Sequence, residues 1–208
     1  MIPVFEFGGV IVDLRKTATI AAFDRLGFDI RPYLGTYKQG GIFAQLENGD
    51  ITTADFYDEI RRISANPTLT DEAIRTAWEA YLVGVPAERL ACLRRVKQNY
   101  RTAVLSNTNP IHWAQAERDY FGTDGYTVAD YFDTLFLSCD LHVQKPDPAI
   151  FDRVTAELGC APEEILFFDD SEENCRVAAA KGWQVRLTPA GGAWVTEAFD
   201  AEGHLRHE

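Results

Sequence analysis

The sequence has few basic residues. Its 208 residues include 20 Lys and Arg against 32 Asp and Glu, which gives a formal net charge of −12. Nucleic acids and anionic membrane surfaces bind clustered Lys and Arg, so this charge argues against both as partners. It also repels anionic substrates at long range. A phosphorylated substrate would therefore need local cations or a bound metal ion to offset the field of the protein.

Long hydrophobic runs and paired cysteines are absent as well. No stretch approaches the roughly 18 apolar residues of a membrane-spanning helix, and the N-terminus has no basic segment followed by an apolar run. Four cysteines are present without a CxxC pair, namely Cys92, Cys139, Cys160 and Cys175. We interpret them as reduced thiols. The sequence thus predicts a soluble, cytoplasmic protein, and we expect a monomer or a weak dimer.

Short apolar runs are the main regular feature. They cover residues 2–7, 102–105, 134–137, 165–168 and 184–187. Each has the length of a strand and is apolar on successive residues, as in strands buried on both faces of a parallel sheet. Helical patterns at residues 87–99, 148–158 and 173–181 accompany the later runs, and Gly182 follows the last of them. This alternation predicts an α/β fold with a doubly wound, Rossmann-like parallel sheet.

Residues 15–83 interrupt the alternation. Their pattern is helical throughout, at residues 16–26, 41–47, 52–65 and 70–82. Thr52 with Asp55 fits a capping box, and Thr70 fits an N-cap. We therefore predict a core made of residues 1–14 and 84–208, with an all-helical cap at residues 15–83 inserted into it.

Four short segments lie at or just beyond the ends of predicted strands. They are residues 4–10 (VFEFGGV), 104–109 (VLSNTN), 144–148 (QKPDP) and 165–171 (ILFFDDS). Sheets of this type bind ligands at the carboxyl ends of their strands, so the segments should converge on one crevice. In order and spacing they resemble the haloacid-dehalogenase-like superfamily, most of whose members are Mg²⁺-dependent phosphatases with an aspartate nucleophile. The resemblance covers nearly the whole chain and identifies the helical insertion as a C1 cap.

Glu6 stands where the resemblance places the nucleophilic carboxylate, which also binds Mg²⁺. Glutamate can form an acyl-phosphate, but its extra methylene moves the carboxylate by roughly 1–1.5 Å, and a misplacement near 1 Å can cost about a hundredfold in rate. The alternative is a solvated residue at a strand end. Gly8 stands where most members carry a general acid. The pattern is closest to an Asp-x-Gly branch, which includes alpha-glucose-1-phosphate phosphatases and also lacks that acid. There Gly8 would offer its backbone carbonyl to the metal.

The second and third segments supply the residues that the resemblance assigns to the phosphoryl group. Ser106 would donate its hydroxyl, helped by the backbone N–H groups of Asn107 and Thr108. Lys145 would be the catalytic cation between nucleophile and phosphate. The alternatives are a simple turn and helix start for residues 106–109 and a solvated loop residue for Lys145.

The fourth segment predicts the rest of the metal site. Asp169 and Asp170 end an apolar strand, where two adjacent buried carboxylates are costly unless a cation holds them. By resemblance Asp170 is the main Mg²⁺ ligand, Asp169 lies beside it, and Asn174 orients the ligands. The alternative, a helix N-cap at this place, is compatible with metal binding.

The predicted cap carries weaker indications. Tyr37, Gln45, Glu47 and His142 could face the crevice and read the hydroxyl groups of a sugar, or could be ordinary surface residues. Trp113 could be either core or substrate platform. We expect Phe56 and Trp78 in the core of the cap.

Together these features predict a Mg²⁺-dependent phosphatase for a small phosphorylated metabolite such as a sugar phosphate, with activity reduced by Glu6. The alternative is a non-catalytic member that binds Mg²⁺ and a phosphorylated ligand. Carbon–halogen hydrolysis is disfavoured because it would leave the acids of the metal site without a role. A phosphomutase is disfavoured because that cycle relies on the acid that Gly8 lacks.

Overall fold

A five-stranded parallel sheet with the order β5-β4-β1-β6-β7 forms the centre of the computed structural model, which describes residues 1–206. The strands are β1 (Ile2–Phe5), β4 (Ala103–Ser106), β5 (Thr134–Leu137), β6 (Ile165–Asp169) and β7 (Gln184–Leu187). From β1 the chain builds outward to β4 and β5, and then returns to the other side of β1 for β6 and β7. The predicted doubly wound α/β fold is confirmed. The reversal beside β1 is a switch point, where such sheets bind ligands.

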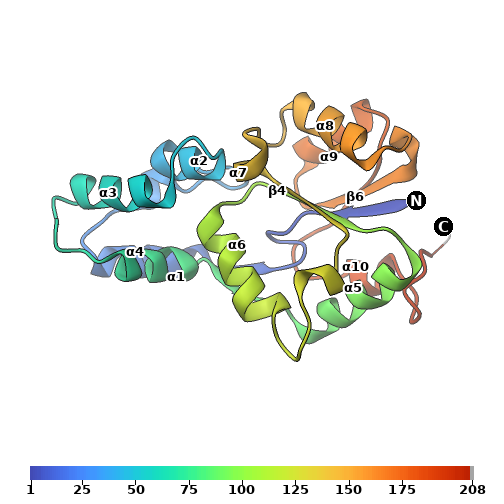
Figure 1. The fold of residues 1–208 in the computed structure, drawn as a ribbon, viewed down its shortest axis with the longest axis horizontal. Coiled ribbons are helices and arrows are strands. Elements are labelled where there is room, and N and C mark those ends of the chain that lie inside the picture. The colour runs from blue at the N-terminus through green and yellow to red at the C-terminus, as the bar shows by residue number, and fades with distance from the viewer. Residues whose placement is uncertain (207–208) are drawn as a thin grey trace.

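Helices cover both faces of the sheet (Figure 1). One layer holds α8 (Pro148–Leu158) and α9 (Glu172–Ala180), and the other holds α5 (Ala87–Asn99) and α10 (Trp194–Glu197). Alternate residues of each strand face alternate layers. Val4 packs in the cluster that contains α8, whereas Phe5 packs in the cluster that contains α5. Burial on both faces explains why the strands are apolar on successive residues.

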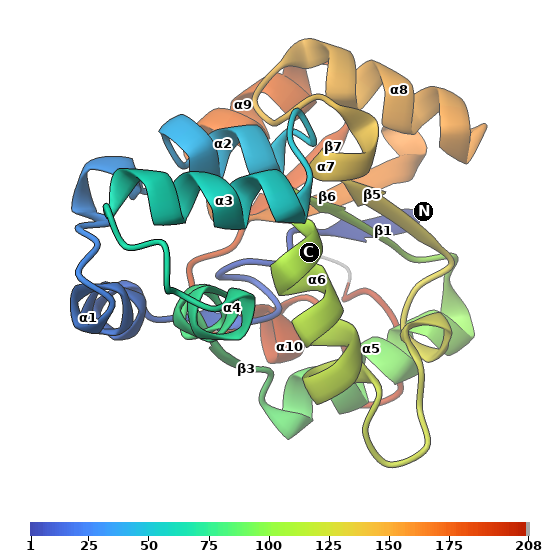
Figure 2. The same cartoon turned by 60° about the vertical axis from the view of Figure 1, so that its left-hand side comes forward.

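Four helices lie between the strands β2 (Asp13–Leu14) and β3 (Leu82–Gly84). They are α1 (Lys16–Arg25), α2 (Gly41–Glu47), α3 (Thr53–Ile63) and α4 (Asp71–Glu79). They form two pairs, α1 with α4 and α2 with α3, that project from the carboxyl edge of the sheet (Figures 1 and 2). An aromatic cluster that includes Phe43, Phe56 and Trp78 joins the pairs, with ring centroids 4.8–5.1 Å apart around Phe43. Phe56 and Trp78 are fully buried, as predicted.

Two further α-helices belong to the core: α6 (Pro110–Ala116), which continues into a π-helical turn at Glu117–Phe121, and the short α7 (Ser138–Leu141). The side chain of Trp113 on α6 is buried against Phe7, with ring centroids 5.4 Å apart. Of the two readings of Trp113, the structure supports the core residue.

Several element ends differ from the prediction. The first strand was expected to reach Phe7 but ends at Phe5, because the Phe7 carbonyl accepts hydrogen bonds from Ile11 and Val12 and turns the chain back. The fourth helix of the insertion ends at Glu79, because Leu82–Gly84 pairs with β2. The β2–β3 pair was not predicted.

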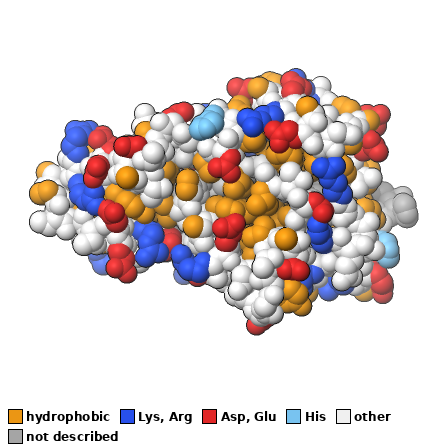
Figure 3. Space-filling view, in the orientation of Figure 1, with side chains coloured by type: hydrophobic (Ala, Val, Ile, Leu, Met, Phe, Trp, Pro, Cys, Tyr) orange, Lys and Arg blue, Asp and Glu red, His pale blue; other side chains and the backbone are white. Residues whose placement is uncertain are grey.

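The surface shows interspersed charges. On the face drawn in Figure 3, acidic and basic side chains alternate, so this face carries no continuous basic stripe of the kind that follows a nucleic-acid backbone. Within residues 1–206 no helix is both long and apolar enough to span a bilayer. All four cysteines are free thiols, and Cys92, Cys139 and Cys175 are buried.

Candidate active site

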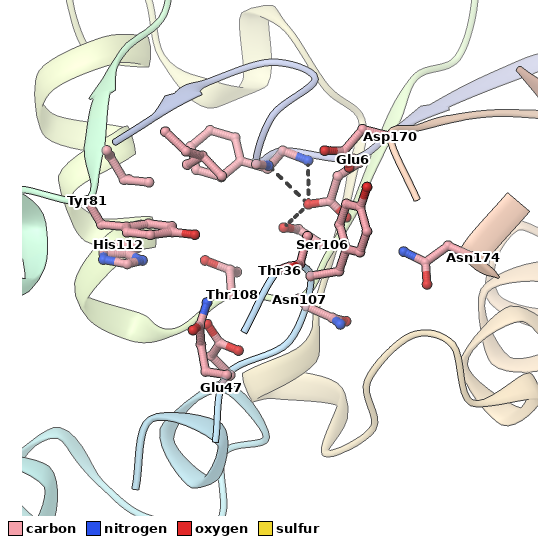
Figure 4. Close-up of a pocket in the computed structure, with 16 residues that line it drawn as sticks. Glu6, Thr36, Glu47, Tyr81, Ser106, Asn107, Thr108, His112, Asp170 and Asn174 are labelled. Carbon is pink, nitrogen blue, oxygen red and sulfur yellow. Dashed lines mark hydrogen bonds between the residues drawn. The ribbon is translucent and has the colours of Figure 1, made fainter. Parts of the chain in front are cut away.

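The four predicted segments meet at the carboxyl ends of β1, β4 and β6. A pocket with a volume of about 80 Å³ opens there, between the sheet and the helical insertion (Figure 4). On one side lie Glu6, Ser106, Asn107, Asp170 and Asn174, and across the pocket from them lie Glu47, Tyr81 and His112. The rest of the lining comes from Phe7, Gly8, Leu14, Thr36, Tyr37, Gln39, Leu82 and Thr108.

Glu6 is at the centre of the first side. Its backbone N–H donates to the Phe168 carbonyl at 2.8 Å, which fixes it at the end of β1. Its side chain folds back over its own loop. Oε1 accepts hydrogen bonds from the N–H groups of Phe7 at 2.8 Å and Gly8 at 3.0 Å, and from Ser106 Oγ at 2.7 Å.

The second carboxylate oxygen of Glu6 forms an ion pair with Lys145. The Lys145 ammonium is fully buried and also donates to Asp169 Oδ2 at 2.6 Å and to the Leu105 carbonyl at 3.0 Å. Two carboxylates and a carbonyl therefore satisfy its three N–H donors. A buried cation needs this compensation, because an unpaired charge in the interior is strongly destabilising.

Asp169 faces away from the pocket. It is fully buried, and its carboxylate accepts hydrogen bonds from Lys145, from the Ser171 N–H at 2.8 Å and from Asn174 Nδ2 at 3.1 Å. These contacts are those of a counter-ion that holds Lys145 in place. A direct role of Asp169 as a metal ligand stays a prediction.

Asp170 does face the pocket, and the residues around it fit a cation. Burial, and then the negative charge of Asp169, raise the pKa of Asp170 to about 6. Apart from its own backbone N–H, no described residue is a hydrogen-bond or ion-pair partner of its carboxylate. It packs so closely on Gly9 that a Cβ there would lie 2.6 Å from Asp170 Oδ2. A bound cation stabilises the ionised form of a carboxylate that is buried beside a second negative charge.

The donor set is compatible with Mg²⁺ in particular. Residues 1–206 contain no group of three or more His, Cys, Asp or Glu side chains arranged to hold a metal. Mg²⁺ usually keeps several waters and takes only one or two protein carboxylates. Asp170, the Gly8 carbonyl and a Glu6 carboxylate released from its hydrogen bonds would hold it here.

Asn107 and Thr108 are placed differently from each other. The Asn107 side chain exchanges two hydrogen bonds with the backbone of Lys145, at 2.8 and 2.9 Å, and so joins the second segment to the third. The Thr108 N–H, expected to face a phosphate, donates instead to Ser138 Oγ at 3.0 Å. Thr108 thus contributes a pocket wall rather than an amide.

The opposite side of the pocket carries polar groups without charge. Burial raises the pKa of Glu47 to about 8 and that of Tyr81 to about 12, so both are protonated at neutral pH. Burial lowers the pKa of His112 to about 4, which leaves the imidazole neutral. The Glu47 and Tyr81 side chains can exchange hydrogen bonds with hydroxyl groups. Both ring nitrogens of His112 are already engaged, by Asn109 Nδ2 at 3.2 Å and by the Trp78 carbonyl at 3.0 Å.

Comparison with known proteins identifies the family. The haloacid dehalogenase-like hydrolase model matches residues 54–182, which is more than half of the chain. A D-ribitol-5-phosphate phosphatase of Bacteroides thetaiotaomicron is 33% identical over 195 residues, which cover 93% of this chain and 94% of that protein. The chain belongs to the haloacid dehalogenase-like hydrolase family.

Solved structures of the family have the same fold as this chain. A haloacid dehalogenase family enzyme of B. thetaiotaomicron, in complex with magnesium and inorganic phosphate, matches with a TM-score of 0.87 and 36% identity over 93% of this chain and 96% of that one. A predicted family hydrolase from Porphyromonas gingivalis matches with a TM-score of 0.85 and 31% identity, over 93% of each chain. An L-2-haloacid dehalogenase from Xanthobacter autotrophicus, at 18% identity and a TM-score of 0.59, shares the fold.

The resemblance seen in the sequence is therefore confirmed at the level of the family, and its Asp-x-Gly branch stays a prediction. Of the weaker indications, Tyr37 and Glu47 do line the pocket. Gln45 and His142 lie in a separate groove, where His142 Nδ1 is 3.1 Å from the Asn48 carbonyl. Tyr81 and His112 were missed. A signal for His112 was its position three residues after Asn109, the N-cap of α6.

Proposed function

We propose that this family member is a Mg²⁺-dependent phosphatase that acts on a small phosphorylated polyol or sugar. One observation carries the proposal. Two backbone N–H groups, the Ser106 hydroxyl and the Lys145 ammonium converge on a single carboxylate at the switch point, in the pocket that Asp170 also lines. Donors arranged in this way stabilise the oxygens of a transferring phosphoryl group. The magnesium and phosphate bound by the similar enzyme of B. thetaiotaomicron support the same reading.

In the proposed reaction, a Glu6 carboxylate oxygen forms a bond to phosphorus while the bond from phosphorus to the ester oxygen breaks. Water then attacks the acyl-phosphate, which releases inorganic phosphate and restores the carboxylate. Bound Mg²⁺ would neutralise charge on the phosphoryl oxygens. Ser106 and Lys145 hold those oxygens throughout. Gly8 has no side chain, so the proton for the leaving oxygen comes from elsewhere.

The opposite side of the pocket supports a polyhydroxylated substrate. Glu47, Tyr81 and His112 lie across the pocket from Glu6 (Figure 4). All three are neutral, and the Glu47 carboxyl and the Tyr81 hydroxyl can bind hydroxyl groups without a charge to attract ions. The D-ribitol-5-phosphate phosphatase among the relatives supports a linear polyol phosphate as the first substrate to test.

The hydrogen bonds of the Glu6 carboxylate favour a second function. Both of its carboxylate oxygens are engaged, which is not the pose of an attacking nucleophile. In that case the chain binds Mg²⁺ and a phosphorylated ligand without hydrolysing it.

The test is release of inorganic phosphate from ribitol 5-phosphate, other sugar phosphates and nucleotides, with and without Mg²⁺. It compares the natural chain with Glu6→Asp and Glu6→Gln. A phosphatase releases phosphate in the natural chain and in Glu6→Asp but not in Glu6→Gln. Release in Glu6→Asp alone would support the binding function for the natural chain, and equal rates in all three would exclude Glu6 as nucleophile.

A further inference from the structure

We infer that the Glu6 carboxylate is the resident occupant of the phosphate site, so that a phosphoryl group binds only after displacing it. This inference rests on the proposed function, because it concerns the same donors. It adds that the affinity of the site for phosphate is set by competition with a side chain of the protein itself.

The hydrogen bonds of Glu6 show the occupancy. Oε1 takes three donors at 2.7–3.0 Å, which exceeds the two lone pairs usually counted for a carbonyl-type oxygen and saturates it. Oε2 takes the Lys145 ammonium. Together these donors form an anion-binding site, and the Glu6 carboxylate is the anion bound in it.

The rest of the pocket offers no second place for a phosphate. Its described lining residues include no Lys or Arg. On the far side, Glu47 and His112 are neutral. The adjoining groove, which shares Tyr37, Asp170 and Asn174 with this pocket, includes Lys38 and Arg176, but within the pocket itself a phosphoryl group must use the donors that Glu6 holds. Two anions cannot share them, because like charges in contact in a buried site repel strongly.

The length of the side chain makes this occupancy specific to glutamate. The backbone of Glu6 is fixed by its hydrogen bond to Phe168, so removal of one methylene retracts the carboxylate by about one C–C bond, roughly 1.5 Å. A hydrogen bond of 2.7 Å to Ser106 Oγ lengthened by that amount no longer exists. An aspartate at this position keeps the negative charge but cannot hold all four donors at once.

The experiment measures the dissociation constant of inorganic phosphate by isothermal titration calorimetry, with and without Mg²⁺. It uses the natural chain, Glu6→Asp, Glu6→Gln and Glu6→Ala. Self-occupancy predicts that Glu6→Ala and Glu6→Asp each bind phosphate at least about tenfold more tightly than the natural chain. Glu6→Gln should bind more weakly than Glu6→Ala, because the amide still fills the site. If charge alone were decisive, Glu6→Asp would bind like the natural chain and Glu6→Gln like Glu6→Ala.

A second readout reports the occupancy directly. Amide hydrogen exchange at Phe7 and Gly8 should be slow in the phosphate-free natural chain, faster in Glu6→Ala, and slow again in Glu6→Ala with phosphate. Equal affinity across the four proteins would overturn the inference while leaving phosphate release, and hence the proposed phosphatase, to stand. If none of the four bound phosphate, the inference and the proposed function would both be wrong.

Discussion

Lys145 shows how a single residue organises the site. Its ammonium is fully buried, and it joins the ends of three strands by contacting Glu6 after β1, Leu105 on β4 and Asp169 on β6. Its geometry therefore depends on counter-ions as much as on the packing of its own segment.

Asp169→Asn should destabilise the protein by about 3 kcal/mol, because it leaves a buried ammonium with one fewer compensating charge. Urea unfolding measures the loss. The matched control is Asp152→Asn, which breaks a Lys–Asp pair of the same length, 2.6 Å, to Lys181 on the surface. That change should cost less than about 1 kcal/mol. Equal losses in the two variants would contradict the role of Asp169 as counter-ion.

Glu47 should make stability depend on pH. Burial holds its pKa in the folded protein at about 8, against 4.5 for an exposed Glu. Between these pH values the folded state keeps a proton that the unfolded state releases, so the free energy of unfolding falls as pH rises. The slope is at most about 1.4 kcal/mol per pH unit. Glu47→Gln should flatten the curve in metal-free urea unfolding between pH 6.5 and 8. Glu59→Gln, which changes a half-buried carboxylate paired with Arg62, should not.

At the scale of elements, α3 begins where the sequence predicted. Thr52 Oγ1 accepts from the Asp55 N–H at 3.1 Å, and Asp55 Oδ2 accepts from the Thr52 N–H at 3.0 Å, which completes the capping box. The helix packs Phe56, Tyr57 and Ile60 against the rest of the insertion.

Thr52→Ala should lower the free energy of unfolding by about 1 kcal/mol through the loss of this cap. Thr53→Ala, one residue later and outside the capping box, is the control and should change it by less than about 0.5 kcal/mol. Chemical denaturation of both variants provides the comparison. A cost at Thr53 as large as at Thr52 would show that the cap is not the cause.

Elements with a local signal were predictable. Helices α2, α5 and α8 have the same bounds as predicted, because apolar spacing and end residues mark them within their own segments. The strands β2 and β3 were not predictable from the sequence. Strands of two or three residues show no periodicity, and only their pairing across the insertion defines them. The site divides in the same way. Ser106 ends β4, Asp170 follows β6, and Lys145 lies in the loop after α7; all three were placed in the site from their motifs.

The contacts missed from the sequence depend on distant partners. The Thr108 amide is taken by Ser138, 30 residues away, and His112 is positioned by the backbone of Trp78, whose carbonyl lies 3.0 Å from Nε2. Neither partner belongs to a motif. The inward fold of the Glu6 side chain was also missed, because the sequence shows the length of a side chain but not which donors surround it.

At the scale of the molecule, a sheet between two layers of helices adjoins the inserted helices, and the pocket lies between this core and the insertion. The insertion also contacts the rest of the protein at places other than the two connecting strands, β2 and β3. Trp78 stacks on His112 with ring centroids 4.4 Å apart, and Ser138 Oγ donates to the Glu47 carbonyl. A boundary between core (1–14 and 84–208) and cap (15–83) remains our proposal.

Mg²⁺ should stabilise the whole molecule through Asp170. At 100 times its dissociation constant a ligand adds about 2.7 kcal/mol to the free energy of unfolding. Asp170→Asn should lose this gain. At pH 8 without metal the same variant should be more stable than the natural chain, by about 1 kcal/mol after allowance for partial exposure, because it removes a carboxylate whose ionisation is disfavoured.

Thermal unfolding with and without Mg²⁺ tests both parts of this expectation. Glu173→Gln, which removes an exposed carboxylate three residues further along, should respond to Mg²⁺ like the natural chain. An unchanged Mg²⁺ response in Asp170→Asn would exclude Asp170 as the main ligand.

The inward fold of Glu6 has a consequence for the end of a catalytic cycle. A phosphatase must discard inorganic phosphate from the same donors that captured its substrate, and tight capture delays that release. A carboxylate tethered beside those donors returns to them as soon as the product loosens. Glu6 would thereby weaken the hold of the protein on substrate and product alike, which favours turnover in surroundings rich in free phosphate over high affinity for a scarce substrate.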